Sequence, residues 1–135
     1  MAPLSDAFRD AALAGDHAAM VETLADEVVF NSPVAFLPFE GRKAVGEVLG
    51  AVMETFEDFR YTDELEGSTA HALVFSARVG SKELQGIDLL RFDSDGRIRD
   101  FTVLVRPLSG TIALAEAMGP KVAHLKGGAR PNGSG

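Results

Sequence analysis

Residues 59–105 read FRYTDELEGSTAHALVFSARVGSKELQGIDLLRFDSDGRIRDFTVLV, and this stretch decides the fold class. Short polar breaks with glycine beside serine or aspartate interrupt it at 67–68, 80–81 and 93–96. The segments between the breaks are rich in aliphatic and aromatic residues and lie at 59–66, 70–79, 83–92 and 97–105. Apolar segments joined by tight turns are typical of antiparallel strands. The sequence therefore predicts a four-stranded antiparallel meander.

The residues before the meander have helical periodicity instead. Apolar residues repeat at helical spacing across a predicted helix that follows Gly41 and ends near 56, as Val45, Val48, Leu49, Val52 and Phe56. Two shorter helices are predicted at 5–14 and 16–24, with Ser5 and Asp16 as N-caps and Gly15 as the left-handed stop between them. A short strand at 28–30, ended by Pro33, and a loop at 34–41 complete this half.

A last helix is predicted from about residue 109, and Gly119-Pro120 should kink or interrupt it. Helices followed by hairpin-linked strands indicate an α+β fold, with the N-terminal helices packed on the antiparallel sheet. Several strands are apolar on both faces, so the face turned away from the helices also needs a cover. We therefore expect a homodimer formed through that outer face.

Length and composition define one domain and exclude several kinds of site. We expect a single domain over 1–126 and a disordered Gly-rich tail at 127–135. There are no cysteines, which excludes disulfides and thiolate sites and fits a cytoplasmic protein. The net charge of −7 argues against nucleic-acid binding. No stretch is long and apolar enough for a membrane span, and the first residues do not resemble a signal peptide.

The three histidines, His17, His71 and His124, are far apart in sequence and lack the spacing of metal ligands. No glycine-rich phosphate loop is present either, because Gly46 and Gly50 lie inside a predicted helix. We therefore predict neither a metal site nor a cofactor.

Several passages resemble one superfamily. They are AGD at 14–16, LADEVVFNSPV at 24–34 with GRKAV at 41–45, and IDLLRF at 87–92 with GRI at 96–98. These passages are similar to the nuclear transport factor 2-like superfamily, which includes SnoaL-type polyketide cyclases, ketosteroid isomerases and limonene-epoxide hydrolases. The resemblance implies a cone-shaped fold, in which a curved sheet and helices enclose an apolar pocket. Because this scaffold carries unrelated activities, function has to be argued from the site.

Ketosteroid isomerases use a carboxylate base and two hydrogen-bond donors that hold an enolate oxygen, one of them an aspartic acid kept neutral by an apolar site. Asp88 matches that aspartic acid. The base position falls on Ser32 and the tyrosine position on Phe8, and neither side chain can perform the matching role. Steroid isomerisation by that mechanism is therefore not expected.

Limonene-epoxide hydrolases use an Asp–Arg–Asp relay, with a tyrosine and an asparagine that hold the attacking water. Asn31 matches the asparagine, but Val29 and Val103 stand at the tyrosine position and at one relay aspartate. Arg78 lacks the acidic neighbour of the relay arginine. SnoaL-type cyclisation requires the least, since one acid/base group near an apolar substrate suffices, and Asp88 is available for that role.

Asp88 is the candidate catalytic residue. It lies in an otherwise apolar strand, and alternation places Asp88, Leu90 and Phe92 on one face. The resemblance implies that this face lines the pocket, where desolvation would raise the pKa of a carboxyl group and let it shuttle a proton. The alternative is an ion pair with Arg78 or Arg91 that serves only to orient the sheet.

The predicted ligand contacts are mostly aromatic or aliphatic. They are Phe8, Phe30, Asn31, Ser32, Val52, Phe56, Phe75, Leu90, Phe101, Val103 and Val105. Only one of Asn31 and Ser32 can point inward, and the family comparisons disagree on which. Phe36 and Phe39 are predicted to form a lid. The alternative is that the phenylalanines simply fill the core and leave no pocket.

Three functions are compatible with this pattern. The leading hypothesis is a cofactor-free cyclase or isomerase that acts on a hydrophobic, carbonyl-bearing small molecule with Asp88 as acid/base. The second is a non-catalytic pocket that binds an apolar metabolite, which the lack of a second titratable pocket residue favours. The third is a protein-association module that uses the outer face of the sheet or the pocket mouth.

Overall fold

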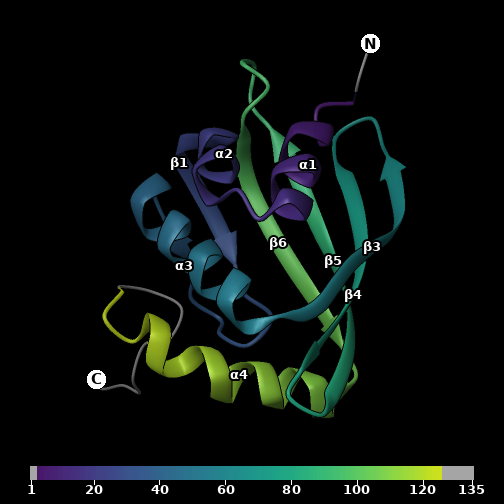
Figure 1. The fold of residues 1–135 in the computed structure, drawn as a ribbon. Coiled ribbons are helices and arrows are strands. Elements are labelled where there is room, and N and C mark those ends of the chain that lie inside the picture. Colours follow the sequence, from purple (N-terminus) through teal and green to yellow (C-terminus); the bar gives the residue numbers. More distant parts are fainter. Residues whose placement is uncertain (1–2, 126–135) are drawn as a thin grey trace.

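A computed structural model describes residues 3–125, and the predicted tail at 127–135 lies outside them. The elements follow in the order α1 (Asp6–Ala14), α2 (His17–Glu22), β1 (Leu24–Asn31), β2 (Phe39–Glu40), α3 (Arg42–Thr55), β3 (Glu57–Glu66), β4 (His71–Val79), β5 (Lys82–Phe92), β6 (Ile98–Arg106) and α4 (Leu108–Val122) (Figure 1). The α+β class and the order of helices, meander and final helix are confirmed.

The strands form one curved sheet in the order β2-β1-β6-β5-β4-β3. The meander β3–β6 is antiparallel throughout, as predicted, and its register places Asp88 of β5 between Leu73 of β4 and Val103 of β6. The sequence did not indicate that β1 would pair in parallel with β6. This parallel pair brings the end of the N-terminal half beside the last strand of the meander.

Strand β1 begins earlier than predicted. The second helix was expected to reach residue 24, but α2 ends at Glu22 and Leu24 is already a fully buried strand residue. The exposed Asp26 and Glu27 hid this strand, because they fall at a bulge between Leu24 and Val29. The guanidinium of Arg42 holds the bulge, donating to the backbone oxygen of Leu24 and pairing with Asp26.

The helix ends agree only partly with prediction. Asp16 caps α2 by accepting a hydrogen bond from the backbone N–H of Ala19, and Gly15 adopts a left-handed conformation with φ of 68°. The predicted cap at Ser5 is wrong, because its hydroxyl is 2.9 Å from Nδ1 of His71 and its backbone is helical. The predicted interruption of the last helix is also wrong. Helix α4 continues through Pro120, which lies in the last turn and removes only one hydrogen bond.

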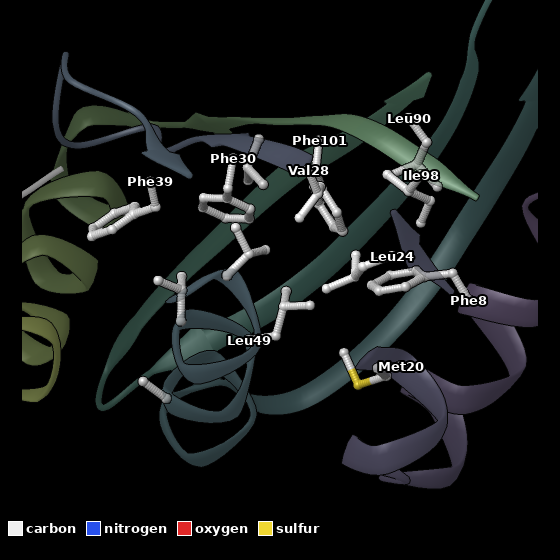
Figure 2. Close-up of a cluster of buried hydrophobic side chains, with 14 of the residues drawn as sticks. Phe8, Met20, Leu24, Val28, Phe30, Phe39, Leu49, Leu90, Ile98 and Phe101 are labelled. Carbon is white, nitrogen blue, oxygen red and sulfur yellow. The ribbon is translucent and has the colours of Figure 1, made fainter. Parts of the chain in front are cut away.

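The helices lie on one face of the sheet, with α4 across one end (Figure 1). Figure 2 shows the core between these layers, where Phe30 of β1 and Phe101 of β6 point toward Leu49 of α3. Phe8 of α1 packs edge-on against Phe101 with ring centroids 5.1 Å apart. No helix among the described residues is long and apolar enough to cross a membrane. The helices and the sheet therefore meet through aromatic contacts such as that of Phe8 with Phe101.

Candidate active site

An apolar cavity of about 480 Å³ lies between the sheet and the helices. Its walls come from α1, α3 and α4, from the loop after β1, and from side chains of β1 and of the meander strands. Among the lining residues that the structure describes, only Ser32, Tyr61 and Asp88 carry polar side-chain groups. An apolar cavity of this size with a few polar groups is typical of a small-molecule site.

Most of the predicted contact residues do line this cavity. They are Phe8, Phe30, Ser32, Val52, Phe56, Phe75, Phe101 and Val103, and the candidate catalytic residue Asp88 lines the cavity as well. The phenylalanines therefore form walls around the space and do not fill it. Contact between these side chains and a ligand stays a prediction.

Three of the predicted residues lie outside the lining. The side-chain amide of Asn31 donates to Oγ1 of Thr102, 2.9 Å away, so Ser32 is the member of this pair that lines the cavity. Leu90 shares the inward face with Asp88, as alternation predicts, but is fully buried in the core. Val105 packs against the edge of the core. Strand alternation identifies the face of a residue, whereas the extent of the cavity along the strand depends on the helices that cover it.

Asp88 is buried inside the cavity wall, with 6% of its surface exposed. Its Oδ2 accepts a hydrogen bond from the hydroxyl of Tyr61 at 3.2 Å. The alternative of an ion pair is wrong, because Arg78 binds Glu57 and Asp58, and the side-chain bond found for Arg91 is to Thr69. Both arginines bind residues of β3 or of the turn after it, and the carboxyl group of Asp88 faces the cavity.

Burial controls the protonation of this pair. Desolvation raises the pKa of Asp88 from 3.8 to about 7, and the hydrogen bond from Tyr61 opposes this rise by stabilising the carboxylate. Burial and the neighbouring Asp88 also raise the pKa of Tyr61, so its phenol is a neutral hydrogen-bond donor near pH 7. Both the acid and the base form of Asp88 are therefore populated at neutral pH, as general acid–base catalysis requires.

Tyr61 is the site residue that sequence reasoning missed, and the expectation of no second titratable group in the pocket is wrong. Tyr61 lies on β3, and β4 separates this strand from the β5 strand of Asp88. The register pairs Tyr61 with Phe75 of β4, and both side chains line the cavity. The available signal was that Tyr61, the single tyrosine of the chain, shares a strand face with Phe59.

The Tyr61–Asp88 pair offers two kinds of chemistry. With Asp88 ionised, the pair holds one proton acceptor beside one hydrogen-bond donor. With Asp88 protonated, it holds two donors that can bind one oxygen atom, such as a carbonyl or an enolate. Within residues 3–125, no group of three or more His, Asp or Glu side chains could hold a metal ion.

Residues 6–101 match the family of the SnoaL-like domain. The chain belongs to this family. Its fold is that of nuclear transport factor 2-like proteins, as the resemblance implied, and several solved SnoaL-like and nuclear transport factor 2-like structures share it. None of the curated proteins matches the chain.

Two solved structures are similar to this SnoaL-like chain in sequence as well as in fold. A steroid delta-isomerase from Pseudomonas aeruginosa shares 43% identity and a TM-score of 0.76, covering 87% of this chain and 93% of its own. An uncharacterized protein with a cystatin-like fold from Silicibacter pomeroyi DSS-3 shares 32% identity and a TM-score of 0.86, covering 92% and 88%. A putative SnoaL-like polyketide cyclase from Shewanella denitrificans OS-217 has a TM-score of 0.64 at 16% identity, covers 84% and 95%, and supports the fold alone.

Proposed function

We propose that this SnoaL-like protein is a cofactor-independent isomerase or cyclase that moves a proton on an apolar, carbonyl-bearing small molecule. The observation that carries the proposal is the 3.2 Å contact between the Tyr61 hydroxyl and the Asp88 carboxyl group inside a cavity lined otherwise almost entirely by hydrocarbon. Similarity to a protein named steroid delta-isomerase supports the isomerase form of the proposal.

The first step is removal of a proton from the carbon next to the carbonyl group. Asp88 in its carboxylate form takes this proton, the carbon–hydrogen bond breaks, and its electron pair moves onto the carbonyl oxygen to give an enolate. Tyr61, released from Asp88 by the bound ligand, donates its hydrogen bond to that oxygen. A donor of this kind acts more strongly in an apolar cavity than in water, because little solvent competes for the charge.

The second step returns the same proton from Asp88. In an isomerisation, the proton goes to a different carbon of the conjugated system, and the carbonyl group re-forms with the double bond in a new place. In a cyclisation, the enolate carbon first attacks a second carbonyl group of the same molecule, and Asp88 protonates the new alkoxide. Either sequence ends with Asp88 as the carboxylate, so no further base and no cofactor is consumed.

The remaining cavity wall fits a substrate that is mostly hydrocarbon. Phenylalanine side chains cover much of it, and Met20, Met53 and Met118 supply unbranched, adaptable side chains. Ser32 is the one other polar side chain at the lining described here, and its hydroxyl accepts the backbone N–H of Val34 at 3.0 Å. We infer a ligand with one oxygen function beside Tyr61 and Asp88 and few polar groups elsewhere.

Deuterium exchange tests this proposal without requiring the natural substrate. Androstenedione, an apolar ketone, is incubated with the protein in D2O, and incorporation of deuterium next to its carbonyl groups is followed by mass spectrometry. We expect exchange above background that Asp88→Asn abolishes and that Tyr61→Phe slows by about 100-fold, the usual effect of removing one such donor. The matched control is Asp100→Asn on β6, whose carboxylate accepts from Thr102 outside the cavity lining and should leave exchange unchanged.

A non-catalytic binder of an apolar metabolite is the second candidate. It is favoured by the hydrogen bond that Tyr61 donates to Asp88, because this bond gives each of the two ionisable groups found at the lining a partner without a ligand. In that function both groups would bind a ligand oxygen without moving a proton. Equilibrium dialysis that detects bound androstenedione, together with exchange no faster than in Asp88→Asn, would select this candidate over the enzyme.

We also propose that the protein is a homodimer that buries the outer face of the sheet. Val74, Ile87 and Leu104 are paired across β4, β5 and β6 and form an apolar row on that face. Leu104 is 53% exposed in the single chain. Sedimentation velocity should show a dimer that Leu104→Arg converts to a monomer, while the control Ile112→Arg, at a 48% exposed position of α4 outside the sheet, stays dimeric. A monomeric unmodified protein would overturn this assembly.

A further inference from the structure

Phe36 is placed unlike every other phenylalanine of the chain. It is 97% exposed, whereas Phe8, Phe30, Phe39, Phe75 and Phe101 are buried and the remaining three are partly buried. A fully exposed phenylalanine leaves a large apolar surface in water. No contact within the described residues accounts for a phenylalanine at this position. The position of Phe36 relative to the cavity offers an explanation.

Phe36 belongs to a loop at the edge of the cavity. The loop spans residues 32–38 between β1 and β2, and we call it the rim loop. Four rim-loop residues line the cavity, Ser32, Pro33, Val34 and Ala35. Val34 is 40% exposed while lining the cavity, and so is Leu13 of α1 at 53%. Lining residues that also contact solvent mark the cavity mouth, so the rim loop forms part of that mouth.

Both ends of the rim loop are anchored in the sheet. Before the loop, Phe30 and Asn31 pair with β6, and the Asn31 side chain binds Thr102. After it, Phe39 pairs with Phe30 and is buried at 3%, with the two rings 6.4 Å apart. The predicted lid role of Phe39 is therefore wrong, because this side chain fixes the loop end within the cavity wall. The residues between these anchors are the part of the loop that the sheet does not hold at either end.

We propose that Phe36 is a further ligand-contacting residue, which the rim loop folds over an apolar molecule bound in the cavity. The proposal rests on the proposed ligand cavity but not on its catalytic chemistry. In the free protein, no apolar surface contacts the Phe36 side chain at its exposed position. A bound hydrocarbon at the mouth supplies an apolar surface that Phe36 can cover. Closure also excludes water from Tyr61 and Asp88, which strengthens the interactions of both groups with a ligand oxygen.

A fluorescence experiment reports closure directly, because the chain contains no tryptophan. In Phe36→Trp the introduced indole should emit as an exposed group, then shift to shorter wavelength and resist acrylamide quenching when saturating androstenedione is added. The matched control is Leu65→Trp on β3, since Leu65 is 59% exposed and does not line the cavity. Its emission should not respond to the ligand.

Affinity provides the second readout. Phe36→Ser should weaken androstenedione binding between about 10- and 100-fold, the range expected for losing burial of one phenylalanine side chain. Its melting temperature should match that of the unmodified protein, because the side chain makes no core contact in the free state. Leu65→Ser should retain full affinity.

The outcomes separate this proposal from the proposed function. Binding with a shifted indole signal and weakened affinity in Phe36→Ser supports closure. Closure is overturned if the unmodified protein binds androstenedione but the emission of Phe36→Trp does not change. It is also overturned if Phe36→Ser binds with full affinity. Either result leaves the cavity function intact. If equilibrium dialysis detects no androstenedione bound to the unmodified protein, both proposals are overturned.

Discussion

Replacing Asp88 with asparagine should change the dependence of stability on pH. The substitution keeps the size of the side chain and an oxygen that can accept the Tyr61 hydrogen bond, but it removes the ionisable group. In the unmodified protein this group is buried in an apolar wall, where the charged form is unfavourable. The comparison therefore isolates the cost of a buried charge.

The sign follows from proton binding. The pKa of Asp88 is about 7 in the fold against 3.8 ordinarily, so between these pH values the folded state binds more protons than the unfolded chain. The free energy of unfolding must then decrease as pH rises. The contribution of the neutral acid is complete below about pH 4 and lost above about pH 7, and the difference in pKa corresponds to on the order of 4 kcal/mol.

Urea denaturation at pH 4 and pH 8 measures this effect. From pH 4 to pH 8, the free energy of unfolding of the unmodified protein should decrease more than that of Asp88→Asn. At pH 4 the variant should be no more stable than the unmodified protein, and at pH 8 it should be the more stable of the two. Asp95→Asn, in the exposed turn before β6, is the control and should follow the unmodified protein. Parallel loss of stability in the unmodified protein and in Asp88→Asn would show that this carboxyl group is not buried as a neutral acid.

Three further results are expected. Tyr61→Phe should raise the pKa of Asp88 further, because it removes the hydrogen bond that favours the carboxylate. Carbon-detected NMR titration measures this pKa, and an unchanged or lowered value would contradict the expectation. Exchange activity at saturating ketone should increase with pH through about 7, as the base form of Asp88 is populated; a decrease would assign the acid form to the first step. Gly86→Ala should lower stability by about 1–3 kcal/mol in thermal denaturation, because its added methyl group would overlap the ring of Phe75. Gly119→Ala is the comparison: its methyl group would enter open space, and the substitution should stabilise α4 by up to about 1 kcal/mol.

The inward position of Asp88 was predictable because strand alternation depends only on local geometry. Side chains two residues apart share a face, so one polar residue in an apolar strand is noticed at once. Tyr61 was not predictable in this way. Its contact with Asp88 spans β4 and depends on the register that pairs Tyr61 with Phe75, which no periodicity in the sequence reports.

The choice between Asn31 and Ser32 was open for a similar reason. Both follow the buried end of β1, and either could have faced the cavity. The parallel pairing of β1 with β6 places Asn31 opposite Thr102, whose hydroxyl binds its amide. The burial of Phe39 was likewise set by its pairing with Phe30 in β2, a two-residue strand too short to produce a pattern.

By itself the sequence determined the α+β class, the antiparallel meander, the aromatic character of the pocket and the inward face of Asp88, because periodicity and turn residues are local properties. Tertiary structure alone decided that a cavity stays open, that Tyr61 meets Asp88 inside it, and that Phe36 is exposed near its mouth. These features arise where segments that are distant in the chain come into contact. The burial that raises the pKa of Asp88 also depends on these long-range contacts.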